Sequence, residues 1–489
     1  MAESRAGARP AGGAGCRGDR GLRDRAVSGR HLPVDGRGNA VRSGERRSCA
    51  MPDLPFSRRT LLQGAAAIAA LPGLPGRAAA QTGSVRTPRP IPPGEKLNIA
   101  CVGCGGKGAT DVQEVSSENI VALCDVDWSR AKRVAQTYPD VPKFQDYRVM
   151  LREMDERIDA VTVTTPDHMH YPVAKMAIEM GKHVYVQKPL THSVWEARQL
   201  AELARRHQVA TQMGNQGQAD EGGRVLCEYL WDGAIGPVRE VHVWTNRPIW
   251  PQALERPKAG ATPPATLDWD LWLGVAPERP YSPAYHPFKW RGWYDFGTGA
   301  LGDIGCHSFA PIARALKLGP PTSVEASSSP LFKETFPAAA IVRYEFPARA
   351  GMPPVKLMWY DGGLKPPRPE GLEPERSLGE GGTIYLGDKG AIYNGRLLPE
   401  SRMSEDPRPP KSLPRSPGHY REWILACKGG EPGGANFDVS GPQAETVLLG
   451  NIALLTKKRL EWDAANLRLA NVPEANAYLR REYRAGWGV

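Results

Sequence analysis

Between residues 95 and 215 the chain alternates short apolar runs with stretches of helical periodicity. The apolar runs show no regular polar alternation, a pattern typical of parallel strands that are covered by helices on both faces. The runs are KLNIACVG, NIVALCDVD, IDAVTVTTP, KHVYVQKP and VATQMGNQG. We therefore predict a doubly wound α/β domain over residues 95–215.

A glycine motif lies at the first turn from strand to helix in this domain. Gly103, Gly105 and Gly108 form a GxGxxG pattern, and Gly106 and Lys107 lie inside it. The first glycine permits a tight turn, the second lets the backbone approach a pyrophosphate, and the third allows close helix packing. The helix that follows presents its positive dipole end to the phosphates. This context predicts a Rossmann dinucleotide site.

The end of the second apolar run indicates which dinucleotide is bound. Asp125 follows the glycine motif by about 20 residues, where this fold binds the adenosine ribose. A carboxylate accepts hydrogen bonds from a 2′-hydroxyl and repels a 2′-phosphate. We therefore expect NAD rather than NADP, with Lys107 offsetting that preference in part. A flavin or a non-redox nucleotide on the same fold is the alternative.

The pattern changes after residue 215. Strand-like runs follow with few helices between them, which predicts an α+β domain with an open, mainly antiparallel sheet over residues 216–460. The runs are EVHVWTNRPIW, SVEASSSP, AAIVRYEF, VKLMWYDG and GTIYLGDKGAIYN. Residues 461–489 are expected to form a tail packed on the body.

The first 80 residues have a different composition. Residues 1–50 are rich in Gly, Ala and Arg, which indicates either a disordered leader or a start codon at Met51. Residues 51–80 have the pattern of an export signal, with Arg58 and Arg59 before a short apolar run. The segment resembles a twin-arginine signal, so we expect export to the periplasm or secretion. The apolar run is too short for a stable membrane span.

Charge and cysteine content argue against two classes of protein. Fourteen of the 63 Lys and Arg residues lie in residues 1–80, together with six acidic residues, so the remaining chain is nearly neutral. We therefore expect no nucleic-acid partner. Cys101 and Cys104 have CxxC spacing, but one lies in a predicted buried strand and the other in the glycine loop. We predict no metal site and no redox pair there.

The order of these motifs resembles the Gfo/Idh/MocA oxidoreductases. The resemblance covers about residues 95–460: a dinucleotide fold, then Gln187-Lys188-Pro189 at the end of the strand-like run KHVYVQKP, then GTGALGDIGCH. It implies that Lys188 reaches both the nicotinamide ribose and the reacting hydroxyl, and that the bond before Pro189 is cis. The family usually has Glu where this chain has Gln187. We expect this change to remove the negative partner of Lys188 and to ease its deprotonation.

The resemblance also implies further catalytic and cofactor-binding residues. Asp303 and His307 are spaced by four residues, which places both on one helix face. The histidine would exchange the proton of the oxidised hydroxyl, and the aspartate would orient the substrate or the lysine. Metal ligation, with His168 and His170 as further ligands, is the weaker alternative. The remaining residues expected at the cofactor are Thr165, Pro166, His170, Gln187 and Gln216.

Two aromatic segments are candidates for a carbohydrate site. Sugars offer C–H faces to aromatic rings and hydroxyls to polar side chains, although buried structural tryptophans show the same composition. The candidate residues are Trp244, Asn246, Arg247, Lys289, Trp290 and Arg291.

Together these features predict an oxidoreductase that transfers a hydride at a carbinol carbon of a sugar, glycoside or polyol. Export favours a tightly held NAD that is reduced and reoxidised within one cycle. One such cycle is redox-assisted glycoside hydrolysis or epimerisation through a transient keto-sugar. A non-catalytic dinucleotide or sugar sensor is the alternative of another class. The resemblance also implies a homo-oligomer, either a dimer or a tetramer.

Overall fold

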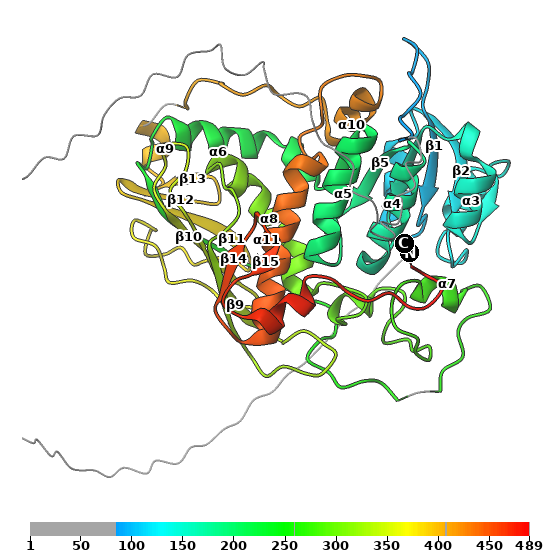
Figure 1. Ribbon diagram of the computed structural model, residues 1–489. Coiled ribbons are helices and arrows are strands. Elements are labelled where there is room, and N and C mark those ends of the chain that lie inside the picture. The colour runs from blue at the N-terminus through cyan, green and yellow to red at the C-terminus, as the bar shows by residue number, and fades with distance from the viewer. Residues whose placement is uncertain (1–84, 259, 406–407, 489) are drawn as a thin grey trace, which may run out of the picture. The chain divides into compact units, whose positions relative to one another are not determined.

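The computed structural model describes residues 85–258, 260–405 and 408–488 (Figure 1). The expected leader and export signal therefore lie outside the described residues.

The first sheet has six parallel strands in the order β3-β2-β1-β4-β5-β6. Most of its strands are buried on both faces, which explains their continuous apolar character. The strands are β1 (Asn98–Val102), β2 (Asn119–Cys124), β3 (Lys143–Phe144), β4 (Ala160–Val163), β5 (His183–Gln187) and β6 (Thr211–Gly214). This order confirms the predicted Rossmann fold.

Helices connect these strands and cover the sheet. They are α1 (Lys107–Glu114), α2 (Lys132–Thr137), α3 (Tyr147–Glu153), α4 (His170–Glu179) and α5 (Val194–His207). A capping box formed by Ser193 and Glu196 begins α5 and fixes the chain directly after Lys188 and Pro189. The strand order reverses between β1 and β4, so a ligand crevice is expected at their carboxyl ends.

The second sheet has nine strands in the order β13-β12-β11-β7-β10-β9-β8-β14-β15. β7 and β10 are parallel and the other pairs are antiparallel, as a mixed, mainly antiparallel sheet requires. The strands are β7 (Val238–Trp244), β8 (Ser323–Ser328), β9 (Ala340–Phe346), β10 (Val355–Tyr360), β11 (Gly382–Gly387), β12 (Gly390–Tyr393), β13 (Arg396–Leu398), β14 (Leu460–Asp463) and β15 (Arg468–Leu469).

Two long helices join this sheet to the first domain. α8 (Gly299–Ala315) and α11 (Phe437–Thr456) pack against each other, and α11 also contacts both β8 and α5 (Figure 1). The other helices are α6 (Glu221–Trp231), α7 (Trp269–Leu273), α9 (Arg402–Glu405) and α10 (His419–Cys427). The amino-terminal half of α8 carries the expected Asp303 and His307.

The sheet continues beyond residue 460, where the sequence suggested a boundary. β14 pairs with β8, so residues that were expected in the tail complete the second sheet. The last residues return to the first domain, where the Arg148 guanidinium lies 4.0 Å from the Trp487 ring centroid. No helix among the described residues is long and apolar enough to cross a membrane. The six cysteines in the described ranges are buried and free.

Candidate active site

The glycine loop is shaped to hold a pyrophosphate. Gly103 has φ of 79°, and a Cβ there would lie 2.5 Å from the Thr164 carbonyl oxygen. A Cβ on Gly108 would overlap the Gly103 carbonyl, so helix α1 lies too close for any side chain. No side chain among the described residues caps the N-terminus of α1 at Gly106. The turn at Gly106 and Lys107 and the start of α1 therefore form a cradle that fits the phosphates of a dinucleotide.

Asp125 ties this loop to the end of β2. Its Oδ2 accepts hydrogen bonds from the amides of Cys104 (2.7 Å) and Gly105 (3.0 Å), and its Oδ1 accepts one from Asp127 (2.9 Å). Burial raises the pKa of Asp125, and these three amides oppose the shift. Its Oδ2 already accepts two bonds, whereas Oδ1 can accept one more, so Asp125 can order the loop and bind a ribose hydroxyl.

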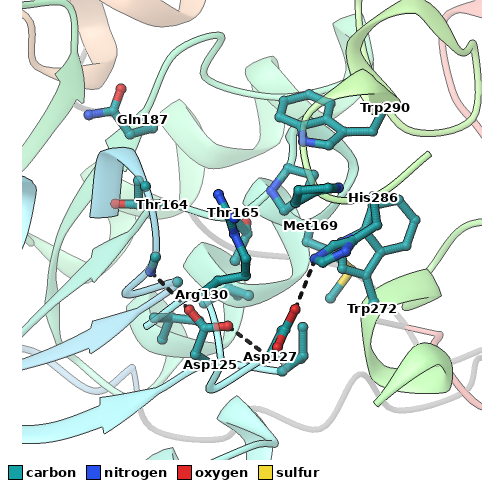
Figure 2. Close-up of a pocket in the computed structure, with 18 of the residues that line it drawn as sticks. Asp125, Asp127, Arg130, Thr164, Thr165, Met169, Gln187, Trp272, His286 and Trp290 are labelled. Atoms are coloured by element: carbon teal, nitrogen blue, oxygen red, sulfur yellow. Dashed lines mark hydrogen bonds and ion pairs between the residues drawn. The ribbon is translucent and has the colours of Figure 1, made fainter. Parts of the chain in front are cut away.

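A cavity of about 370 Å³ runs from the glycine loop to helix α8. Figure 2 shows its walls near Asp125 and Asp127, with Thr165 and Met169 beyond them. Of the residues predicted to form the site, the following line it: Gly103, Gly105, Gly106, Lys107, Asp125, Thr165, Pro166, Gln187, Lys188, Trp290, Arg291 and Asp303. The structure thus brings the cofactor loop and the proposed catalytic lysine into one cavity.

Lys188 and Asp303 form an ion pair at the end of the cavity near α8. The Lys188 Nζ donates to Asp303 Oδ1 and to the Asp303 carbonyl, both at 2.8 Å. The Arg291 Nε lies 3.1 Å from the same Oδ1. Burial alone would raise the pKa of Asp303, but the two cations outweigh it and lower that pKa. The Lys188–Pro189 bond is cis, as the sequence predicts.

The expectation that Gln187 leaves Lys188 without a negative partner is wrong, because Asp303 takes that place. Gln187 instead donates a hydrogen bond to Asp111, a carboxylate that was not predicted to belong to the site. Asp111 on α1 is fully buried, and the Gln187 Nε2 lies 2.9 Å from its Oδ2. A glutamate in place of this glutamine would set two buried carboxylates against each other.

Asp111 is the centre of a hydrogen-bond network beneath the glycine loop. Besides Gln187, it accepts from Thr164 Oγ1 (2.8 Å), Lys107 Nζ (2.7 Å) and Tyr420 OH (2.6 Å). Tyr420 lies on α10 of the second domain, so the network joins both domains at the cofactor site. The sequence signal that could have revealed this network is an aspartate, Asp111, next to Val112 on the face of α1 that packs against the sheet.

His307 lies on the predicted helix face but does not line the cavity. Its Nδ1 lies 2.9 Å from Asn215 Oδ1, so this nitrogen donates its proton to the amide oxygen. Burial lowers the pKa of His307 to about 4, and the charge on Lys188 adds to the shift. His307 is therefore neutral at pH 7.

Three other residues expected at the cofactor lie outside the cavity wall. His170 is buried, with Nδ1 2.7 Å from the Pro189 carbonyl and Nε2 2.9 Å from the Thr165 carbonyl. It positions the ends of β4 and β5 rather than contacting a ligand. The Gln216 Nε2 donates to Tyr185 OH at 3.1 Å. Gly108 lies behind the glycine loop, where it allows the close packing that was predicted.

The candidate carbohydrate residues divide into two groups. Trp290 and Arg291 line the cavity, and the Arg291 guanidinium lies 4.2 Å from the Trp290 ring centroid. Trp244 instead packs in the second sheet, stacked on Tyr393. The other three do not line the cavity: Asn246 donates to Glu380, Arg247 donates to Asn246, and Lys289 begins the short helix η4 (Lys289–Gly292).

Several cavity residues were not predicted from the sequence. A cover formed by residues 267–291 and 484–487 reaches the end of β2 from the second domain and the C-terminal tail. His286 Nε2 lies 3.6 Å from Asp127 Oδ2 (Figure 2), and the Asp268 amide donates to the Val126 carbonyl. Other cavity residues that were not predicted include Arg130, Asp167, Trp272 and Trp487. Such contacts between distant segments leave no local pattern.

Two family models match the chain. Residues 97–215 match the NAD-binding Rossmann fold of the Gfo/Idh/MocA oxidoreductase family, and residues 250–343 match the C-terminal alpha/beta domain of that family. Both matches support a Gfo/Idh/MocA oxidoreductase. The matched first domain is NAD-binding, in agreement with its glycine loop and Asp125. No group of three or more potential ligands in the described ranges could hold a metal ion.

Curated relatives of this chain match over part of their length. A Glycosyl hydrolase family 109 protein of Saccharopolyspora erythraea is 29% identical over 286 residues, which are 53% of this chain and 54% of the relative. An uncharacterized oxidoreductase of Synechocystis sp. is 24% identical over 216 residues, 44% of this chain and 49% of the relative. The chain spans about half the length of these relatives.

Solved structures share the fold over most of their length. The WlbA dehydrogenase from Bordetella pertussis, in complex with NADH and UDP-GlcNAcA, has a TM-score of 0.53 at 17% identity, covering 75% of this chain and 99% of its own. GenD2 from gentamicin A biosynthesis, in complex with NAD, has a TM-score of 0.52 at 19% identity, covering 77% and 99%. At this identity the likeness establishes the fold.

Proposed function

We propose that this NAD-binding oxidoreductase transfers a hydride at a CH–OH carbon of a sugar, glycoside or polyol. The observation that carries the proposal is the ion pair of Lys188 and Asp303 in the cavity that begins at the glycine loop. A partly buried cation beside a dinucleotide site suits an oxygen that gains negative charge when its proton leaves.

The residues of the chain have separate tasks in this reaction. NAD, when bound, supplies the acceptor or donor of the hydride. The glycine loop and the N-terminus of α1 hold the pyrophosphate, and Asp125 orders the loop. Lys188 donates a hydrogen bond to the carbinol or carbonyl oxygen, while Asp303 keeps the ammonium oriented.

A carbohydrate substrate is supported by the cavity wall and by the relatives. The Arg291 guanidinium lies 4.6 Å from the Phe288 ring centroid and close to the Trp290 ring as well. Rings and a planar polar group together offer stacking surface and hydrogen-bond donors to a sugar. Several relatives are named as Glycosyl hydrolase family 109 proteins, and the WlbA structure contains a sugar nucleotide.

The cover supports tight retention of the cofactor. It places Trp272, His286 and Trp487 against the cavity, so a bound dinucleotide would be enclosed by parts of both domains. Retention suits the proposed twin-arginine export, because a protein outside the cytoplasm has no pool of NAD to draw on. The hydride would then return within one cycle, either to a second sugar or to the same sugar.

The first test is to purify and dialyse the protein, denature it, and quantify the NAD and NADP released per chain. Near-stoichiometric NAD is the expected result, and a panel of sugars and glycosides should then reduce it. A protein that releases no dinucleotide and binds none on addition would contradict the proposed enzyme. Continuous dependence of turnover on added NAD would contradict retention while leaving the oxidoreductase intact.

Redox-assisted glycoside cleavage or epimerisation is the second candidate, and the names of the relatives favour it. A transient keto group acidifies the neighbouring C–H, so that carbon should exchange with solvent deuterium during turnover. Released aglycone or epimer with no accumulated NADH would support this route. Stoichiometric NADH without solvent exchange would favour simple dehydrogenation. A dinucleotide sensor would bind NAD and turn over no sugar.

We also propose that the protein is exported in the folded state and that it forms a homo-oligomer. A reporter that is active only when exported in the folded state should be exported by residues 51–80 and retained when Arg58 and Arg59 are both replaced by Lys. A dimer or tetramer is expected in light scattering.

A further inference from the structure

Asp167 is a buried carboxyl in the cavity for which the proposed mechanism gives no task. It begins the short helix η2 (Asp167–Met169) directly after β4 and is 3% exposed. Thr298 Oγ1 donates to its Oδ2 at 2.7 Å. The next residue, His168, is held by the carbonyls of Trp272 (3.0 Å) and Phe296 (3.3 Å), which fixes the turn. Asp167 is therefore held in place at the cavity wall.

The charged groups around Asp167 form a cluster whose net charge depends on whether Asp167 is protonated. Lys188 from the end of β5 and Arg291 from η4 both pair with Asp303 from α8, so two cations share one carboxylate. An ionised Asp167 makes this cluster neutral, and a protonated Asp167 leaves it with one positive charge. Burial raises the pKa of Asp167 to about 7 and Asp303 adds to the shift, whereas Thr298, Lys188 and Arg291 oppose it.

His170 and His307 are less suited to exchange this proton. Both ring nitrogens of His170 on α4 lie against backbone carbonyls. His307 is bound to Asn215 and has its pKa lowered to about 4 by burial, so it holds a proton only weakly at neutral pH. Proton exchange is fastest when the pKa of the group lies near the working pH.

We propose that Asp167 is a catalytic residue that accepts and returns the substrate proton. This inference rests on the proposed oxidoreductase function. The C–H bond breaks with its electron pair leaving as a hydride to NAD, the O–H proton passes to the Asp167 carboxylate, and carbon and oxygen form a carbonyl. Lys188 stabilises the oxygen throughout. In the reverse direction the Asp167 carboxyl returns the proton as the carbonyl accepts the hydride.

The inference can be tested without knowing the sugar. The nicotinamide ring of NAD⁺ is positively charged and NADH is not, so NAD⁺ bound beside Asp167 favours its ionised form. If the pKa falls by about one unit from near 7, binding at pH 7 releases about 0.4 proton per site. Calorimetric titration of cofactor-stripped protein in buffers of different ionisation enthalpy measures that number. NADH should release clearly less.

Three variants assign the released proton to a residue. Asp167→Asn should abolish the release while still binding NAD⁺. Thr298→Val removes the hydrogen bond to Oδ2, so the pH at which release is greatest should rise. Asp361→Asn is the matched control. Asp361 is buried, and burial also raises its pKa to about 7. It accepts hydrogen bonds from Ala340 and Trp359 in the second sheet and does not line the cavity. This control should release protons as the parent does.

Each outcome decides the inference. If Asp167→Asn releases as many protons on NAD⁺ binding as the parent does, the inference is overturned. If that variant does not fold, an unchanged pH dependence of proton release in Thr298→Val overturns it instead. Once a substrate is in hand, Asp167→Asn should lower kcat at least about 100-fold and remove the acidic limb of the pH profile. If Asp167→Asn keeps the acidic limb of the pH profile, the inference is also overturned. Failure of every sugar with proton release intact would count against the proposed substrate class and not against the titration of Asp167.

Discussion

Replacing Gln187 by Glu tests how the buried carboxylate of Asp111 shapes the site. The substitution keeps the side-chain shape and exchanges an amide donor 2.9 Å from Asp111 for a carboxylate. Two adjoining buried carboxylates cannot both ionise, so the introduced glutamate must fold protonated and then donate its O–H to Asp111. The substitution is therefore expected to destabilise the protein by the free energy of protonating that glutamate.

The magnitude follows from the pH. A free glutamate has a pKa of about 4.3, and each unit above it costs about 1.4 kcal/mol, so protonation costs about 1 kcal/mol at pH 5 and up to about 4 kcal/mol at pH 7. The folded state binds more protons than the unfolded state, so the deficit in the free energy of unfolding grows as the pH rises above 4.3. Below that pH the deficit is small.

Urea denaturation of the parent and the variant at pH 5, 6 and 7 measures this deficit. Gln199→Glu is a matched control, because Gln199 lies 3.3 Å from Glu202 on the exposed face of α5. A like-charge pair in solvent should cost less than about 0.5 kcal/mol at any of these pH values. A Gln187→Glu deficit that equals the control, or that does not change with pH, would refute the reasoning.

Three further predictions concern the cofactor and catalysis. Lys188→Met removes the cation that pairs with Asp303 in the cavity, so it should lower kcat/KM at least about 1,000-fold while NAD per chain stays unchanged. Lys289→Met is the control, because Lys289 does not line the cavity, and this variant should stay active. Trp487→Ala opens the cover and should speed NAD release about tenfold in a displacement assay; an unchanged rate would remove the tail from retention. Asp125→Ser should narrow the preference for NAD over NADP at least about tenfold in Kd, and an unchanged ratio would show that another residue sets it.

The Rossmann domain could be read from the sequence because its signals are local. Fully buried parallel strands need continuous apolar runs, and a turn as tight as the one at Gly103 needs glycine. The same reasoning located most strands of the second sheet. It missed β3, β13, β14 and β15, each only two to four residues long, because strands of that length form through pairing with neighbours.

The site was predictable only in part. Lys188 and Asp303 were found because motif order places them at a strand end and on a helix face, and the structure joins them. Trp244 looked like a sugar-binding ring, but its strand directs it into the packed sheet against Tyr393. Whether a tryptophan faces a ligand or a core depends on which face of the sheet it occupies, and a short aromatic segment does not reveal this.

The fold class, the dinucleotide loop and the lysine at the end of β5 follow from local patterns, since each depends on residues close together in the chain. Which charges meet follows from the tertiary structure. Asp303 pairs with Lys188 across 115 positions, Gln187 meets Asp111 across 76, and Thr298 meets Asp167 across 131. The electrostatics of a buried site depend on distances through space, and these are set by packing within the first domain and between the two domains.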